Sequence, residues 1–259
     1  MIRKFQTRQI LTLGIDHIWG ADLLIMTKYA NENNGFKYIL NVIDCFSKYA
    51  WSVPLKTKFS IDVAEAFEKI LLESEPRKPK LLHCDRGSEF IGKAFKTMLK
   101  RHDIRMYHTF SELKSSIVER FNGTLNEKLK IQFEVNGIFK WLNILPDVLI
   151  EYNEHSIHRT IGTTPSAVNG ENENEIFNRI YGEKKVTIKY KPQLKLMDRV
   201  RISKKKYLFK NKYSRNWSRE IFVITAIHRT EPITYSIHAL NGEEILGRFY
   251  KQDLQKTAF

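Results

Sequence analysis

The chain has 259 residues, of which 42% are hydrophobic, so it is long enough to bury a substantial core and to form more than one domain. Lysine and arginine exceed aspartate and glutamate by 14, which favours a polyanionic partner. The sequence has no secretory signal, no internal repeat and no long apolar run, which predicts a soluble intracellular protein that does not bind a membrane.

The first predicted elements are three strands, which follow a basic amino-terminal arm. Residues 18–26, 36–46 and 49–55 are rich in aromatic and β-branched side chains, as is typical of strands. Short polar turns at 33–35 and 47–48 separate them. We therefore expect an antiparallel meander.

Helices then alternate with strands. Ser60 is predicted to cap a helix with its apolar residues at helical spacing. A strand at 78–85 precedes a second helix, which Ser88 should cap and which should run on through Leu99. A further strand is expected at 103–110.

A long helix is predicted at about 117–133. Its apolar stripe contains Ile117, Phe121, Leu125 and Leu129, whereas Glu119, Asn122, Gly123, Asn126 and Lys130 fall on the other side. Further helical segments are expected at 141–156 and 163–168.

The last part of the chain differs in composition and pattern. Residues 183–259 hold 18 basic and 7 acidic residues, and they contain four short strand patterns separated by polar turns. We predict an amino-terminal arm at 1–14, an α/β core at 15–182, a linker at 183–195 and a basic β-barrel at 196–259.

Three acidic residues occupy informative positions in the predicted core. Asp22 lies inside an apolar strand, where an unpaired carboxylate would be costly; either a salt bridge or a metal ion could compensate it. Asp85 ends a strand before Arg86 and Gly87, which is also the composition of an ordinary turn. Glu119 could be an ordinary solvated acid on the polar side of the long helix.

In this order, the three acids resemble the D,D,E transposase and retroviral-type integrase core. The stretches "WGADLLIM", "YILNVIDCFSKYAWSVPLK", "HCDRGSEF" and "KSSIVERFNGTLNEKL" resemble integrase blocks, and 33 residues separate Asp85 from Glu119, close to the family's interval in the mid-thirties. Within this superfamily the chain is most similar to integrases of Polinton (Maverick) elements, because "DRVRIS", "NWSREIF" and "ILGRFYKQDLQK" resemble their carboxyl-terminal region.

The resemblance implies a fold and an activity. The fold would be a ribonuclease-H-like mixed-sheet catalytic core followed by a small SH3-like or chromo-like β-barrel. The activity would be that of a two-metal polynucleotidyl transferase in which Asp22 and Asp85 share one Mg²⁺ or Mn²⁺ ion and Asp22 and Glu119 hold the other. Water would attack when a 3′ end is trimmed, and the freed 3′-hydroxyl would attack when that end is joined to target DNA.

The expected partner is double-stranded DNA, both element ends and target, bound by a homo-oligomer. Localisation would be the nucleus of a host cell, or a viral factory or virion if the gene is viral. The candidate DNA-binding residues are Lys114, Arg120, Asn122, Asn126, Lys130, Arg199, Arg201, Lys204, Lys205, Lys206, Lys210, Lys212, Arg215 and Arg219. A merely solvated basic surface is the alternative for the tail.

Several features depart from the resembled family. Related integrases have a zinc-binding module with paired histidines and cysteines, whereas Cys45 and Cys84 stand alone here, and His155 with His158 lacks further zinc ligands nearby. Gly123 and Asn126 replace basic residues of the family's glutamate helix, which should weaken binding of element ends. An integrase-derived DNA-binding protein without efficient catalysis, and a nuclease of RNA–DNA hybrids, therefore remain alternative functions.

Overall fold

The computed structural model describes residues 10–85, 87–108, 116–182, 191–203, 217–229 and 232–258, apart from the side chains of His108, Ser116 and Leu246. The chain divides into two compact units. The larger contains the described residues between Thr12 and Gly182, and the smaller contains those from Lys191 onward together with Ile10 and Leu11. The exact boundaries of the predicted domains stay a prediction, because 1–9 and 183–190 lie outside the described residues.

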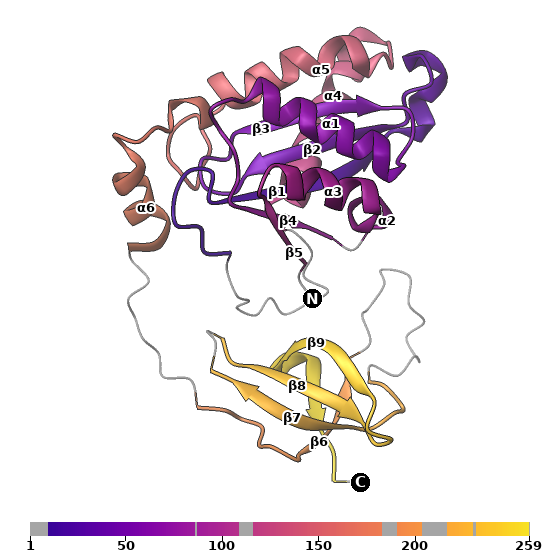
Figure 1. Ribbon diagram of the computed structural model, residues 1–259, viewed down its shortest axis with the longest axis vertical. Coiled ribbons are helices and arrows are strands. Elements are labelled where there is room, and N and C mark those ends of the chain that lie inside the picture. The colour runs from indigo at the N-terminus through magenta and orange to yellow at the C-terminus, as the bar shows by residue number, and fades with distance from the viewer. Residues whose placement is uncertain are drawn as a thin grey trace. The chain divides into compact units, whose positions relative to one another are not determined.

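The larger unit is built around a mixed five-stranded sheet in the order β3-β2-β1-β4-β5 (Figure 1). Strand β1 is antiparallel to β2 and parallel to β4, and β3 and β5 are the edge strands. The elements of this unit are β1 Ile18–Ile25, β2 Tyr38–Asp44, β3 Ala50–Leu55, α1 Ser60–Glu73, β4 Leu81–Cys84, α2 Ser88–Ile91, α3 Lys93–Arg101, β5 Arg105–His108, α4 Ser116–Asn136, α5 Trp141–Ile150 and α6 Glu173–Tyr181.

Helices cover both faces of this sheet. Helices α1, α2 and α3 pack on one face around buried aromatic residues such as Trp19, Phe67 and Phe95. Helices α4 and α5 pack on the other face, where Phe121, Trp141 and residues of β2 form a second core. The sequence of β2 explains why both faces are buried, because apolar residues occur at the positions that point to each face of the sheet. The predicted meander of β1, β2 and β3 is confirmed.

Two helix starts differ from the prediction. Ser60 is the first helical residue of α1 and does not cap it; its Oγ accepts a hydrogen bond from the backbone N–H of Phe95 at 3.3 Å. The predicted helix from Ser88 through Leu99 is broken at Gly92 into α2 and α3, and Ser88 does not cap α2. A Cβ at Gly92 would lie 2.3 Å from Ser60 Oγ, so the absence of a side chain there permits this close approach.

The smaller unit is a five-stranded antiparallel sheet in the order β10-β6-β7-β8-β9. Its strands are β6 Arg199–Ile202, β7 Phe222–His228, β8 Thr234–Ala239, β9 Glu244–Tyr250 and β10 Leu254–Lys256. Its core contains Val200, Phe222, Ile224, Ile237 and the ring of Tyr235. The four predicted strands of the tail are confirmed, and the sequence patterns missed the short strand β10.

Candidate active site

Strand pairing places two of the three predicted acids next to each other. Ala21 of β1 is in register with Cys84 of β4, and the two strands are parallel. Asp22 directly follows Ala21 and Asp85 directly follows Cys84, so the two acids occupy neighbouring positions roughly 5 Å apart. Both are partly exposed. The sequence order alone did not require this pairing, which depends on β1 lying beside β4.

Asp85 also shapes the turn that follows it. Its Oδ1 accepts a hydrogen bond from the backbone N–H of Gly87 at 2.9 Å, which orients the carboxylate at the end of β4. This is the arrangement of an Asx turn. The interpretation of Asp85 as a turn residue and its interpretation as a site residue are therefore compatible.

The pKa of the Cys84 thiol is affected by the negative charges at this end of β4. Burial, followed by the charges of Asp85, Asp22 and Glu89, raises the pKa of its thiol to about 12. Glu89 was not among the predicted site residues, although it lies only four residues after Asp85 in the first turn of α2. A Cβ at Gly87 would lie 2.6 Å from Glu89 Cδ, so the carboxylate of Glu89 lies over Gly87. Three carboxylates thus influence one buried thiol.

Helix α4 connects Glu119 to the same region. Glu119 lies exposed in the first turn of α4, and Asn122 lies one turn further along. Asn122 Nδ2 donates a hydrogen bond to Asp22 Oδ2 at 2.8 Å. Asn122 was predicted to contact DNA; in the structure its amide contacts a predicted metal ligand. Helix α4 therefore meets β1 at Asp22.

Among the described residues, Asp22, Asp85 and Glu119 do not stand together as a group of three metal ligands. Within the described part of the chain, no group of three or more His, Cys, Asp or Glu side chains is arranged to hold a metal ion. Asp22 and Asp85 nevertheless offer oxygen donors from neighbouring strands, which is the ligand type that Mg²⁺ prefers. The donor set therefore fits a divalent ion in chemistry and in strand position.

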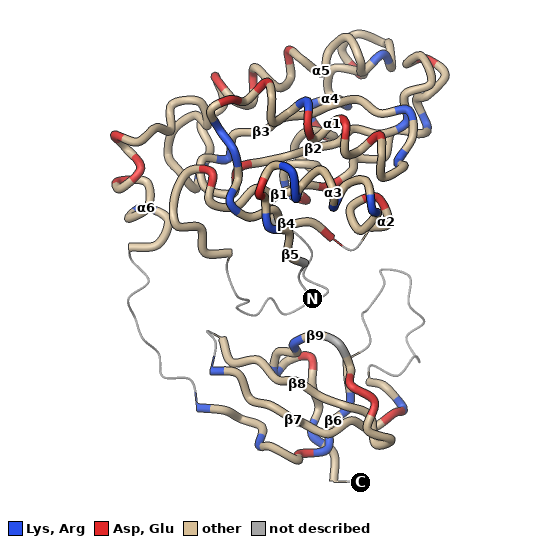
Figure 2. Tube along the Cα trace, viewed as in Figure 1, with Lys and Arg blue, Asp and Glu red and all other residues tan. Residues whose placement is uncertain are grey.

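Only some of the predicted DNA-binding residues are described. Arg120 and Lys130 are exposed on α4 and Asn126 is half-buried; Arg199 and Arg219 are exposed and Arg201 is half-buried in the smaller unit. The remaining candidates, Lys114, Lys204, Lys205, Lys206, Lys210, Lys212 and Arg215, lie outside the described residues. Acidic and basic residues are interspersed over the larger unit, which agrees with the small net charge of its sequence (Figure 2).

The predicted histidine pair lies beyond α5, where the helix continues as the π-helical turn Glu151–His155. His158 Nδ1 accepts a hydrogen bond from the backbone N–H of Thr160 at 3.3 Å. Burial, together with the charges of Lys48 and Arg120, lowers the pKa of His158 to about 4. His158 is therefore a neutral side chain near two cations at neutral pH.

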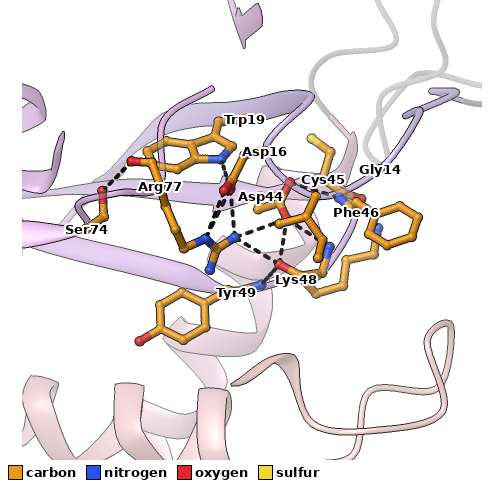
Figure 3. Close-up of polar contacts among 12 residues, drawn as sticks. Gly14, Asp16, Trp19, Asp44, Cys45, Phe46, Lys48, Tyr49, Ser74 and Arg77 are labelled. Atoms are coloured by element: carbon orange, nitrogen blue, oxygen red, sulfur yellow. Dashed lines mark hydrogen bonds and ion pairs between the residues drawn. The ribbon is translucent and has the colours of Figure 1, made fainter. Parts of the chain in front are cut away.

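An ion-pair cluster holds the opposite ends of β1 and β4 (Figure 3). Arg77 Nη2 donates to Asp16 Oδ1 at 2.8 Å and to Asp44 Oδ2 at 3.2 Å. The guanidinium also lies 5.0 Å from the ring centroid of Trp51. Burial raises the pKa of Asp44, an effect opposed by hydrogen bonds from Ser47 and by the charge of Arg77. Because Asp16 precedes β1 and Arg77 precedes β4, the cluster supports the register that brings Asp22 beside Asp85.

Known sequences relate the chain to integrases. The family described as "Integrase core domain" matches residues 15–110. A transposon-derived protein of Caenorhabditis elegans is 28% identical over 221 residues, which cover 85% of this chain and 72% of that protein. The retrovirus-related Pol polyprotein from transposon 297 of Drosophila melanogaster is 30% identical over 140 residues, which cover 54% of this chain and 13% of that polyprotein.

Solved structures show the same fold. The HTLV-2 integrase catalytic core domain in complex with magnesium aligns over 60% of this chain and 97% of its own, with a TM-score of 0.50 and 20% identity. A simian T-cell lymphotropic virus intasome in complex with a PP2A regulatory subunit aligns over 100% of this chain and 84% of its own, with a TM-score of 0.65 and 16% identity. The predicted ribonuclease-H-like fold is confirmed, and the carboxyl-terminal sheet is consistent with an SH3-like domain. The chain therefore has the fold of integrase catalytic cores, and its residues 15–110 match the family of integrase core domains.

Proposed function

We propose that this protein is a DNA integrase that trims the 3′ ends of an element and joins them to target DNA. The observation that carries the proposal is the parallel register of β1 and β4, which brings Asp22 and Asp85 side by side inside an integrase core domain. Glu119, in the first turn of a helix that contacts β1 through Asn122, is the third proposed ligand.

The carboxylates of Asp22, Asp85 and Glu119 would bind two Mg²⁺ or Mn²⁺ ions. Bound there, the ions would activate the attacking oxygen and neutralise the charge that develops at phosphorus. In trimming, a water oxygen bonds to phosphorus while the bond from phosphorus to the 3′ oxygen breaks. In joining, the freed 3′-hydroxyl attacks a target phosphodiester and the target's 3′ oxygen leaves. Trimming replaces one phosphorus–oxygen bond with a bond to a water oxygen, and joining replaces one with a bond to the element's 3′ oxygen, so neither step requires a covalent enzyme intermediate.

The finer assignment is to integrases of the Polinton (Maverick) type. The carboxyl-terminal stretches "DRVRIS" and "ILGRFYKQDLQK" support it, as does the match to a transposon-derived protein that covers 85% of this chain. The proposed partners are element ends and target DNA, bound by a homo-oligomer. The proposed location is the host nucleus, or a viral factory or virion for a viral gene. Among the described residues, no helix has the length and apolar character needed to cross a membrane.

A DNA-binding protein without efficient catalysis is the second candidate. It is favoured by the incomplete metal site among the described residues, and by Gly123 and Asn126 on the face of α4 that carries Glu119. Such a protein would still assemble on DNA through its basic tail. The two candidates differ in one measurable property, the making and breaking of phosphodiester bonds.

A branched duplex that mimics the joined product tests the chemistry without knowledge of the element's ends. Because the joining step is reversible at the level of mechanism, an active site that joins DNA should also resolve this branch in Mg²⁺ or Mn²⁺. Asp22→Asn, Asp85→Asn and Glu119→Gln should each abolish resolution, because a neutral amide is a poor substitute for a charged metal ligand.

Glu127→Gln is the matched control, because Glu127 is also exposed on α4 but lies away from the proposed site. This variant should resolve the branch at the parent's rate. Normal resolution by any of the three site variants would remove that residue from the catalytic set. Binding without resolution by the parent protein would favour the second candidate.

A further inference from the structure

A row of polar residues crosses the sheet beside the proposed site. Asp22 of β1 is in register with Asn41 of β2, and Asn41 is in register with Ser52 of β3. Side chains at paired positions point to the same face of a sheet. This face is the one that α4 covers, and it is otherwise apolar: Ile39 and Ile43, two residues either side of Asn41, are both fully buried in the core under α4.

Hydrogen bonds link this row of polar residues to α4, and each side chain donates to the next one in the series. Ser52 Oγ donates to Asn41 Oδ1 at 2.5 Å, and Asn41 Nδ2 donates to Asn122 Oδ1 at 2.7 Å. Asn122 Nδ2 in turn donates to Asp22 Oδ2 at 2.8 Å. The chain therefore starts at a hydroxyl on an edge strand and ends at a carboxylate of the proposed active site.

The order of donors and acceptors determines how each amide is turned. The side chain of Asn41 is fully buried, so a missing hydrogen bond at either end of its amide would be costly. The Ser52 hydroxyl occupies the amide oxygen, which leaves the Asn41 NH₂ group to meet the oxygen of Asn122. Asn122 must then present its own NH₂ group to Asp22. With the Asn122 amide reversed, its oxygen would face the Asp22 carboxylate, and two acceptors would repel each other.

We propose that Asn41 and Ser52 are positioning residues, which act through Asn122 to hold the Asp22 carboxylate in the orientation that binds the metal ion beside Asp85. This inference rests on the proposed function and deepens it, because it names residues on β2 and β3 that neither touch DNA nor bind the metal ion. Hydrogen-bond partners behind a metal ligand commonly change metal affinity by roughly 10- to 100-fold.

The hydrogen-bond chain itself can be tested by NMR of the 259-residue protein with ¹⁵N-labelled asparagine. The side-chain amide protons of Asn41 and Asn122 should exchange slowly with solvent in the parent protein. Ser52→Ala should accelerate their exchange, whereas Ser52→Thr, which retains the hydroxyl, should preserve the slow exchange. Asn153 is the internal control, because its side chain bonds to the backbone of Ala50, two residues before Ser52 on the same strand.

The consequence for the site is measured by calorimetric titration with Mn²⁺ alone, without DNA. Ser52→Ala and Asn41→Val should each weaken Mn²⁺ binding by roughly 10-fold or more, as expected for lost outer-shell partners, and Ser52→Thr should restore the affinity. Unchanged Mn²⁺ affinity in folded Ser52→Ala, or no Mn²⁺ binding by the parent, overturns the proposal. So does unchanged amide exchange in that variant.

These readouts separate this inference from the proposed function. A parent protein that binds Mn²⁺ through the oriented carboxylate but never resolves branched DNA would contradict the proposed integrase activity while supporting the positioning role. A parent that resolves DNA, with Ser52→Ala showing the parent's amide exchange and Mn²⁺ affinity, would support the activity and refute the positioning role.

Discussion

At the scale of single residues, the cluster around Arg77 contains a buried charge and joins segments that precede β1 and β4. The side chain of Asp44 is fully buried, and Arg77 is the cation that pairs with both Asp44 and Asp16. Loss of one partner of a buried pair leaves the other as an uncompensated charge. The strands held by this cluster are those that carry Asp22 and Asp85.

Arg77→Ala should therefore lower the free energy of unfolding by roughly 2 to 4 kcal/mol, somewhat below the range for fully buried pairs because Arg77 is partly exposed. Adding Asp44→Asn should recover part of this loss, since the second change removes the orphaned charge. Urea unfolding measures both effects. Lys69→Ala is the control, because Lys69 forms an exposed pair with Glu73 on α1 and should cost less than about 1 kcal/mol. Equal losses for Arg77→Ala and Lys69→Ala would show that the cluster contributes nothing special.

At the scale of elements, α4 carries the proposed metal ligand Glu119, but it has Gly123 and Asn126 where the resembled integrases have basic residues. A Cβ at Gly123 would meet no atom within 4 Å, so the structure contains no packing reason for this glycine. Gly123 and Asn126 lie on the same side of the helix as Glu119. A longer basic side chain can therefore be accommodated at Gly123 without displacing a neighbour.

Gly123→Arg combined with Asn126→Lys should tighten binding of element-end DNA, with a gain that shrinks as salt concentration rises, because two cations are added beside the proposed site. Fluorescence anisotropy with labelled duplex measures the affinity. Gly123→Ala separates charge from helix stability: it should raise the free energy of unfolding by up to about 1 kcal/mol and leave DNA affinity unchanged. Equal affinity of the double variant and the parent in low salt would show that this face does not meet DNA.

At the scale of the whole molecule, the net positive charge is concentrated in the carboxyl-terminal part of the sequence rather than in residues 1–182. Residues 183–259 contain 18 of the 43 lysines and arginines, and only 7 of the 29 acidic residues. Under the proposed function, this asymmetry assigns the chemistry to the larger unit and much of the affinity for DNA to the tail.

Replacing Lys204, Lys205 and Lys206 with Gln should lower the slope of log affinity against log salt by about 2.7 if each lysine neutralises one phosphate of duplex DNA. The measurement is equilibrium binding of random-sequence duplex over a series of salt concentrations. Replacing Lys28, Lys69 and Lys78, which are exposed on the larger unit, controls for the same loss of net charge. A slope that falls equally in both variants would contradict a special role for the tail.

The sequence by itself predicted most of the helices and strands and the two-part organisation, because hydrophobic period and turn residues are local properties. It missed α6 and β10, and the role of the three acids stays a prediction. It could not determine that the helix is interrupted at Gly92, where Ser60 of α1, 32 residues earlier in the chain, approaches too closely for a side chain. Nor could it determine that Asn122 bonds to Asp22, 100 residues away, or that Asn41 and Ser52 stand in the same row. Those contacts depend on which strands pair, in which register, and on which face a helix packs. The pairing, the register and the packed face are the arrangement of lowest free energy for the assembled core as a whole. Only the tertiary structure could therefore reveal them.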